Sequence, residues 1–225
     1  MNENKIIETK NRRIFEDKIV YKDGRVEEFE FGITEIAEEA YKDKRNIVSV
    51  ILPKSVTKIG KSAFYKCSHL AEIELQGGVS EIDEWAFAYC DKLTTVIIPN
   101  SLTLIGKWAF FGCKKLSGVS VPSSVTYIGD YAFDACESLY EISIPESVTE
   151  IAYGVFYDCK NLCKIEIPKS VTSIDKYALN GCTSLKDIYY GGSASDWSKI
   201  KIEKVGNEKL AGTLFQRAKI HYNCK

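Results

Sequence analysis

A 23-residue period restricts the fold of this chain more than any other feature of its sequence. Six of the eight cysteines stand 23 residues apart, at Cys67, Cys90, Cys113, Cys136, Cys159 and Cys182. Aligned on these cysteines, residues 33–193 divide into seven repeats that begin at Ile33, Val56, Val79, Leu102, Val125, Val148 and Val171. A fixed period of about 20 to 50 residues is typical of a solenoid, in which each repeat forms one coil and stacks on the next.

The constant positions of the repeat identify its core. Position 4 is isoleucine in all seven repeats, position 9 is aromatic in six, and position 12 is cysteine in six. Position 8 is alanine except at Val155, and positions 15, 18 and 20 are aliphatic in nearly every repeat. The positions between them vary and are mostly polar. We therefore expect the constant positions to point inward and the variable positions to point outward.

Spacing within the repeat predicts the path of one coil. Positions 18 and 20 alternate with polar neighbours, as in a short strand, and proline follows at position 21 in five repeats. Positions 2 and 4 predict a second short strand, and positions 8, 9 and 12 share one face of a helical turn. Stacked coils would pair their strands in parallel, about 4.8 Å apart.

The cysteines at position 12 are predicted to be buried and reduced. Neighbouring coils hold their Cβ atoms parallel at about the coil spacing, whereas a relaxed disulfide needs convergent Cβ atoms about 3.8 Å apart. A free cysteine in a core behaves as a small hydrophobic residue. Position 2 is threonine or serine in every repeat. Its hydroxyl is expected either to bond a backbone group at the corner of the coil or to face water.

The ends of a solenoid expose core and strand edges, so they require caps. Residues 1–32 are predicted to form an N-terminal tail and a capping hairpin, because alternating segments flank Asp23-Gly24 within residues 12–31. Residues 194–225 are predicted to form a C-terminal cap. It would contain a short helix carrying Trp197 and Ile200, and a final strand carrying Ala218, Ile220 and Tyr222.

Composition and motifs give no indication of catalysis. The net charge is -1, with 30 Lys and Arg against 31 Asp and Glu, so no nucleic-acid partner is expected. No apolar run approaches the roughly 20 residues that a membrane helix needs, so insertion into a membrane is not expected either. The N-terminus has no apolar export segment, so the chain as written is expected in the cytoplasm. Cys67 points inward while His69 lies in an outward position, which excludes a Cys-His pair. We expect no enzyme activity, no cofactor and no metal site.

Two outward surfaces are candidates for binding. The candidate ligand-binding residues are aromatic and follow one side of consecutive coils: Trp85, Tyr89, Trp108, Phe111, Tyr127 and Tyr131. Exposed Trp and Tyr are enriched in binding hot spots, but the same rings could instead lie on the ridge and stabilise stacking. Positions 17 and 19 form an acidic strand face with Glu72, Glu74, Glu141, Glu166 and Asp187. This face either favours a basic partner or is simply solvated.

The segment IPESVTEIAYGVFYDCKNLCKI, residues 144–165, resembles the repeat of BspA-like, Treponema-type leucine-rich repeat proteins. The tail IYYGGSASDWSKI…AKIHYN resembles the C-terminal cap of that family, so the resemblance covers residues 33–222. It implies a leucine-rich repeat solenoid without enzymatic activity. It also implies a bacterial cell-surface or secreted protein that binds host proteins or other cells.

Three functions follow as hypotheses. The leading one is a non-enzymatic protein-interaction or adhesion module with a protein partner, whether a host or a cell-surface protein. The second is a carbohydrate-binding surface protein that uses the ladder of Trp85, Trp108 and Tyr131. The third is a structural scaffold that self-associates weakly through the same aromatic patch.

Overall fold

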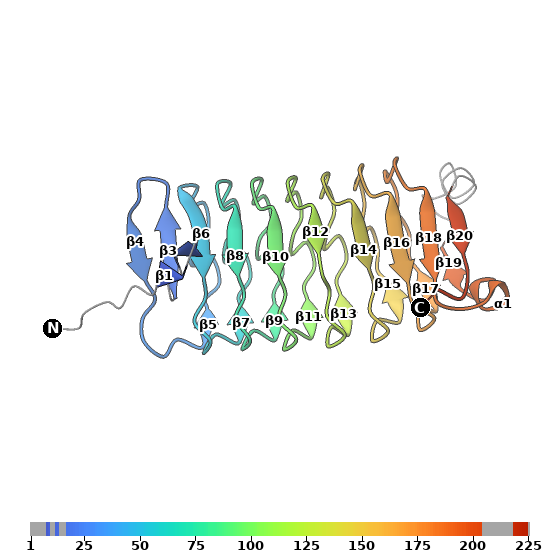
Figure 1. The fold of residues 1–225 in the computed structure, drawn as a ribbon, viewed down its shortest axis with the longest axis horizontal. Helices are drawn as coiled ribbons and strands as arrows, with labels where there is room; N and C mark the ends of the chain where they lie inside the picture. Colours follow the sequence, from blue (N-terminus) through green and yellow to red (C-terminus); the bar gives the residue numbers. More distant parts are fainter. Residues whose placement is uncertain (1–7, 10–11, 14–16, 204–217, 225) are drawn as a thin grey trace.

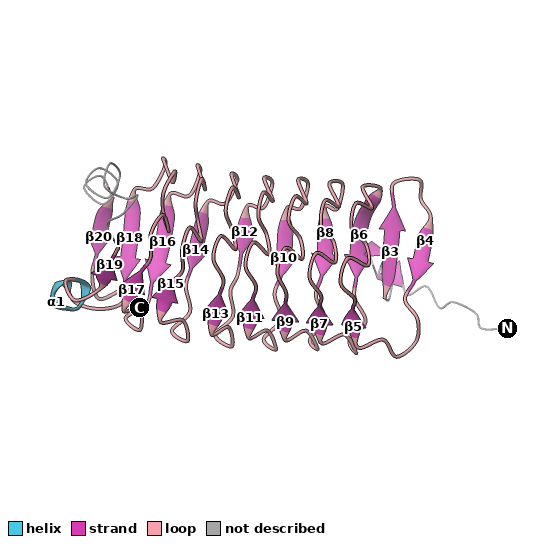
Figure 2. Cartoon of the chain, turned by 180° about the vertical axis from the view of Figure 1, so that it is seen from behind, coloured by secondary structure: helices cyan, strands magenta, loops and turns pink. Residues whose placement is uncertain are grey.

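The repeats form the coils of one elongated stack (Figure 1). The computed structural model describes residues 8–9, 12–13, 17–203 and 218–224. Each coil contributes one strand to a large sheet and one to a narrower ladder. The segments between them run along the side opposite the large sheet (Figure 2). The predicted leucine-rich repeat solenoid of short parallel strands is therefore confirmed.

The large sheet has ten strands within the described residues, in the order β20-β18-β16-β14-β12-β10-β8-β6-β3-β4. From the N-terminal edge these strands are β4 (Val26–Glu28), β3 (Lys18–Tyr21), β6 (Ile47–Ile51), β8 (Glu72–Glu74), β10 (Thr95–Ile97), β12 (Gly118–Val119), β14 (Glu141–Ser143), β16 (Lys164–Ile167), β18 (Asp187–Tyr190) and β20 (Lys219–His221). Pairs between coils are parallel and offset by one repeat, as in Val50↔Ile73 and Ile73↔Val96. Residues at the same repeat position therefore lie above one another.

The second ladder consists of two-residue strands that end at the constant isoleucine. One part contains β5 (Glu35–Ile36), β7 (Lys58–Ile59), β9 (Glu81–Ile82), β11 (Leu104–Ile105) and β13 (Tyr127–Ile128). The other part contains β15 (Glu150–Ile151), β17 (Ser173–Ile174) and β19 (Lys201–Ile202). β13 and β15 belong to different sheets, so the ladder is interrupted between coils 5 and 6.

The interruption, which we call the seam, coincides with two departures in coil 6 from the neighbouring coil. Ala152 and Val155 stand where coil 5 has Gly129 and Ala132. A Cβ added at Gly129 would lie 2.6 Å from the backbone nitrogen of Lys107, so adjacent coils approach closely at this position. Asp83 and Asp175 carry side chains at the same position as Ala152 and keep the bond to the preceding coil at 2.9 Å, so a side chain there does not by itself open the ladder. The separation of the coils widens at the seam, where the Phe133–Phe156 step is 5.9 Å.

The predicted helical turn is wrong in its backbone conformation. Positions 7 and 11 have positive φ angles, for example 54° at Trp108 and 68° at Gly112. The N–H groups at positions 7, 9 and 11 donate to carbonyls of the next coil, as Phe110 does to Ala132 at 2.8 Å. The segment is thus a third ladder between coils. Within the described ranges the one α-helix is α1 (Ala194–Trp197).

Stacked phenylalanine and cysteine side chains fill the core. The rings of Phe64, Phe87, Phe110 and Phe133 lie parallel with centroids 5.4 Å apart, and the step from Phe133 to Phe156 across the seam is 5.9 Å. All six position-12 thiols are free and buried. Each donates to the position-9 carbonyl of the preceding coil at 3.1–3.3 Å. The predicted ladder of reduced thiols is confirmed.

The position-2 hydroxyls also bond between coils, as the first of the two alternatives requires. Thr57 donates to the Thr34 carbonyl and Thr103 to the Ser80 carbonyl, both at 3.1 Å. The bond from Thr172 to Thr149 continues the series. Among the hydrogen bonds of the described residues, the one from Thr149 to Thr126 is missing, which again places the seam between coils 5 and 6.

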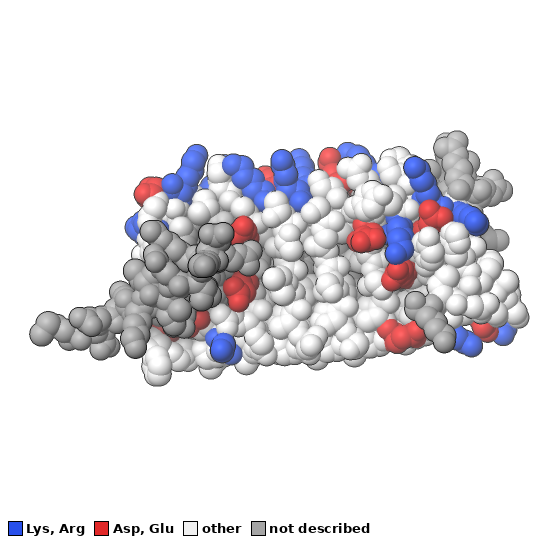
Figure 3. Space-filling model, viewed as in Figure 1, with Lys and Arg blue, Asp and Glu red and all other residues white. Residues whose placement is uncertain are grey.

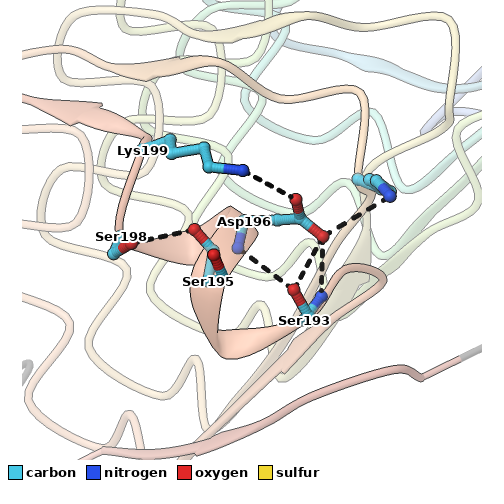
Figure 4. Close-up of polar contacts among 6 residues, drawn as sticks. Ser193, Ser195, Asp196, Ser198 and Lys199 are labelled. Carbon is cyan, nitrogen blue, oxygen red and sulfur yellow. Dashed lines mark hydrogen bonds and ion pairs between the residues drawn. The ribbon is translucent and has the colours of Figure 1, made fainter.

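Both predicted caps contain the expected elements, with different bounds. The N-terminal hairpin is β3–β4, and β3 pairs antiparallel with β6. A separate short pair, β1 (Glu8–Thr9) and β2 (Arg12–Arg13), precedes it. At the other end Ser193 and Asp196 form a capping box that starts α1 (Figure 4). Trp197 packs edge-on against Tyr190, and β20 closes the large sheet against β18.

Candidate binding surfaces

The aromatic ridge is the set of rings that the turn segments place on the side opposite the large sheet. Its members are Tyr65, Trp85, Tyr89, Trp108, Phe111, Tyr131, Tyr153, Tyr157 and Tyr177. The rings of Trp85 and Trp108 stack with centroids 4.9 Å apart and an interplanar angle of 12°, and Trp108 stacks on Tyr131 at 5.6 Å. Phe111 meets both Trp85 and Tyr89 edge-on. Five of the six predicted ligand-binding residues therefore lie together.

The stacking covers the ring faces. Trp108 has Trp85 on one face and Tyr131 on the other, and Trp85 meets the edge of Tyr65. The outward edges of these half-buried rings remain exposed. Since a sugar stacks on the face of an aromatic ring, the ridge offers ring edges where a carbohydrate platform needs ring faces.

The ring at position 7 requires an unusual backbone. Trp85, Trp108, Tyr131 and Tyr177 have φ angles of 54–59°, in the left-handed region where a bulky residue costs about 1–2 kcal/mol. Glycine occupies this position in coil 6, as Gly154. The stacked rings offset part of this cost, because an aromatic pair contributes about 0.5–1.5 kcal/mol beyond its burial.

Tyr153 belongs to the ridge although its repeat position did not predict it. Its ring lies 5.2 Å from Tyr131 and 5.3 Å from Tyr177, and so bridges the ring that Gly154 lacks. The available signal was the glycine between Tyr131 and Tyr177 at position 7, with a tyrosine directly before it. Tyr127, by contrast, lies on β13 with 43% exposure and contacts no other ring within the described part of the chain. The structure does not bring Tyr127 into the ridge.

A buried carboxyl group, which the sequence did not single out, lies within the ridge. Asp134 is 8% exposed, and burial raises the pKa of its carboxyl group from 3.8 to about 7, with a further contribution from Asp158. A hydrogen bond from the backbone N–H of Ala135 opposes this rise. The ridge around Asp134 is therefore closely packed and poorly hydrated.

The strand face is the outer surface of the large sheet, made by positions 17 and 19. Figure 3 shows its carboxylates in two groups separated by an uncharged centre. Glu72 and Glu74 lie on β8 and are exposed, and no ion pair involves either of them within the described residues. Glu141 and Glu166 lie 3.9 Å and 2.7 Å from the Lys164 ammonium. The acidic residues predicted from the sequence thus share one face but do not form one continuous acidic surface.

The two ends of this face differ in charge compensation. Asp187 pairs with His221 across β18 and β20 at 2.7 Å, and the ring of Tyr189 stacks on His221 at 4.5 Å. At the C-terminal end each of these carboxylates therefore has a lysine or histidine partner on the same face. Glu72 and Glu74 have no such partner within the described residues.

An exposed isoleucine stands in the uncharged centre. Ile97 on β10 is 66% exposed and pairs in register with Glu74. On the next strand, β12, Gly118 is in register with Thr95 and has open space where a Cβ would project. A shallow depression of about 220 Å³ adjoins this strand, lined in part by Ser120, Ser143 and Glu166. The centre of the strand face therefore carries an apolar projection next to a hollow.

Cys67 and His69 do not form a catalytic pair. The Cys67 thiol donates to the Tyr41 carbonyl rather than to His69, and burial raises its pKa to about 12. A thiol with such a pKa is not an activated nucleophile. In the described residues no group of three or more His, Cys, Asp or Glu side chains could hold a metal ion. No helix among them is long and apolar enough to cross a membrane.

Comparisons with known proteins agree with this architecture. The family model described as BspA type leucine rich repeat region matches residues 34–131 and 109–210. The crystal structure of the T. pallidum leucine-rich repeat protein TpLRR is 35% identical, with a TM-score of 0.64, over 68% of this chain and 72% of that protein. No curated protein matches the chain.

Two further structures share the fold over a larger part of this chain. A leucine-rich repeat protein from Bacteroides ovatus is 27% identical over 81% of the chain, with a TM-score of 0.65. The chain spans 56% of the length of that protein. The pneumococcal vaccine antigen PcpA, at 21% identity, covers 92% of the chain and 46% of its own length with a TM-score of 0.63, and is similar in fold alone.

Proposed function

The chain belongs to the BspA-type leucine-rich repeat family, and from that premise we propose that it is a non-enzymatic module that binds a protein partner through its strand face. Membership relates it to bacterial leucine-rich repeat proteins. The binding surface is argued from the residues of this chain.

The exposed centre of the strand face is the single observation that carries the proposal. Ile97 is 66% exposed in the middle of a sheet whose inner face is fully packed. Apolar anchors surrounded by polar residues are typical of protein interfaces. Glu72 and Glu74 stand on the neighbouring strand and have no ion pair within the described residues, which favours a partner that brings a cation beside an apolar side chain.

The aromatic ridge supports binding less well than the strand face. Its ring faces are occupied by neighbouring rings at 4.9–5.6 Å, and Asp134 is buried among them. This geometry favours the interpretation that the rings stabilise coil stacking. The carbohydrate-binding hypothesis would require binding through ring edges, which give little stacking area.

The experiment compares three proteins as affinity baits in lysates: the wild-type chain, a strand-face variant and a ridge variant. The strand-face variant is Ile97→Lys with Glu74→Lys, and the ridge variant is Tyr131→Phe with Tyr177→Phe. We expect a protein that binds the wild type saturably at micromolar concentration and binds the ridge variant equally well. Its affinity for the strand-face variant should fall at least about tenfold, as expected for loss of a central anchor.

Two results would reject the proposal. One is the absence of saturable binding at micromolar concentration. The other is a partner whose affinity falls with the ridge variant and not with the strand-face variant. Circular dichroism of the variants verifies that each is folded. A glycan array probed with wild type and the ridge variant tests the carbohydrate hypothesis separately.

A further inference from the structure

Cationic side chains gather along one edge of the stack, where the strands of the large sheet begin (Figure 3). We call the part of this edge in coils 1–4 the basic rim, which consists of positions 11–14. The rim contains six cationic side chains: Lys44, Arg45, Lys66, Lys92, Lys114 and Lys115. The same positions contain two carboxylates, Asp43 and Asp91. An almost neutral chain therefore carries a local excess of positive charge on one edge.

Most charges of the rim are not compensated. Arg45 pairs with Asp43 at 3.5 Å. Lys66 lies over the ring of Tyr65, 5.0 Å from its centroid, which orients the cation without neutralising it. The remaining four lysines of the rim are exposed and have no ion pair within the described residues.

Cations along the second ladder are arranged differently. Lys58, Lys61 and Lys107 each pair with a carboxylate one coil further along, at 2.6–2.9 Å. Stacking therefore places a lysine within ion-pair distance of the side chain 23 residues away, on the next coil. For five of the six rim cations that partner position holds another cation or a neutral residue, as where Lys115 follows Lys92. Lys114 is followed by Glu137, which pairs instead with Lys160 at 3.3 Å. The rim is consequently a row of like charges held close together by the stack.

The row is straight and rigid because the strands that follow it are paired in register. Coils 1–4 are joined through β6, β8, β10 and β12, so the rim extends for about 14 Å at about 4.8 Å per coil. A depression of about 240 Å³ lies along it, lined by Arg45, Lys66, Ser68, Tyr89 and Asp91. Such a surface matches a linear polymer that carries anionic groups at short, regular intervals.

The side chains discriminate among polyanions. Five of the six cations are lysines, which act as point charges and lack the planar fork that Arg uses for bidentate recognition. Nearby ring faces are covered by stacking, as for Trp85 and Trp108 at 4.9 Å, so bases of a nucleic acid find no platform. An acidic peptide is flexible and loses conformational entropy on binding, whereas a stiff polymer loses less.

We propose that the basic rim binds a linear sulfated polysaccharide. Sulfate groups stay ionised across the physiological pH range, and the lysine row contacts them as point charges. The site differs from the strand face in both residues and ligand class. It therefore goes beyond the proposed function and does not depend on it.

The test measures binding of the purified chain to heparin, as the probe, by isothermal titration calorimetry and by salt elution from heparin resin. The rim variant is Lys114→Gln with Lys115→Gln. Its matched control is Lys54→Gln with Lys176→Gln, which removes the same charge after β6 and after β17. We expect the rim variant to bind heparin about 10- to 30-fold more weakly and to elute at lower salt. The control should change less than about twofold.

Competition at equal anionic charge identifies the ligand class. Free heparin should displace bound heparin from the protein at a concentration at least about tenfold lower than the concentration of single-stranded DNA or poly-glutamate that achieves the same displacement. Equal displacement by either competitor overturns the proposal, as do equal losses in the rim variant and its control, or no heparin binding by the wild type. The Ile97→Lys, Glu74→Lys strand-face variant adds positive charge and should bind heparin at least as tightly as the wild type, so failure here and failure of the proposed function are distinguishable.

Discussion

The buried phenylalanine column and the aromatic ridge use the same stacking geometry in different surroundings. Phe87 and Phe110 stack at 5.4 Å and are fully buried, whereas Trp85 and Trp108 stack at 4.9 Å and are half-exposed. Both columns result from the 23-residue register, which places like residues above one another. An aromatic ladder on a solenoid surface is therefore expected from stacking alone. By itself it is weak evidence for a ligand.

The two columns differ in backbone strain. Phe110 lies in a turn with an ordinary φ, whereas Trp108 has a φ of 54°. A large residue in the left-handed conformation destabilises the fold, and the buried phenylalanine column does not have this backbone strain. In the ridge, stabilising ring contacts therefore occur together with a strained backbone. Four measurements can test how the buried column and the ridge differ.

The largest effect is expected in the buried column. Phe110→Ala should lower the free energy of unfolding by about 3–5 kcal/mol, because it removes a fully buried ring and leaves a cavity between two others. Urea denaturation followed by circular dichroism measures this. A loss under about 1 kcal/mol would show that the stacked rings do not hold the coils together.

The second measurement concerns the carboxyl group of Asp134 in the ridge. Its raised pKa means that the unfolded chain releases this proton near pH 4 while the folded chain retains it to about pH 7. Stability should therefore fall as the pH rises through this window, by about 4 kcal/mol at most. Asp134→Asn should remove that fall and be more stable than wild type at pH 8. Urea denaturation of both proteins at pH 4 and pH 8 measures the difference, and equal pH dependence would contradict the prediction.

The third measurement separates stacking from strain at Trp108. Trp108→Ala and Trp108→Gly both lose the ring contacts, but glycine adopts the left-handed conformation without a Cβ penalty. We expect the glycine variant to be more stable than the alanine variant by about 1 kcal/mol. At Phe110, where φ is ordinary, alanine should be at least as stable as glycine. An alanine advantage at Trp108 would show that strain is not stored there.

The smallest effect concerns the seam, where both columns change. The Phe133–Phe156 step widens to 5.9 Å, and Gly154 interrupts the position-7 rings. The Gly129 and Asp175 N–H groups donate to the coil before them at 2.8 and 2.9 Å, whereas the described hydrogen bonds include none from Ala152. The Ala152 amide should exchange its hydrogen at least about tenfold faster than the other two, as hydrogen-exchange mass spectrometry can show. Equal protection at all three amides would mean that the seam is closed in solution.

The path of each coil could be predicted because the constant repeat positions are the ones that point into the core. Inward residues such as Ile105, Phe110 and Cys113 are fixed by packing, and a constant column can only be a stacked column. The backbone of the turn could not be predicted in the same way. Its left-handed positions hold Trp108 and Tyr131, which have no intrinsic preference for that conformation, so tertiary context determines it.

The surfaces were less predictable than the core. Composition indicates a nearly neutral chain, whereas the repeat alignment collects Arg45, Lys92, Lys114, Lys115 and Lys160 at positions 13 and 14, against Asp91 and Glu137. The structure adds that these positions lie along one edge of the stack. Strand β19 was not predicted, because it pairs Ile202 with Ile174, which is 28 residues away instead of 23. Tyr153 was not predicted as part of the ridge, because it stands at repeat position 6 and takes the place of a position-7 ring. Each omission occurs where the chain departs from its own period.

The in-register ladder also determines which changes of length the molecule tolerates. Duplication or loss of one whole repeat among coils 2–4 would lengthen or shorten the stack by about 4.8 Å. Residues at the same repeat position would still lie above one another on each surface. Inserting a single residue in a strand would shift the register of that strand by one residue and turn its core side chains to the outside. Evolution can therefore lengthen this protein readily, but only in whole coils.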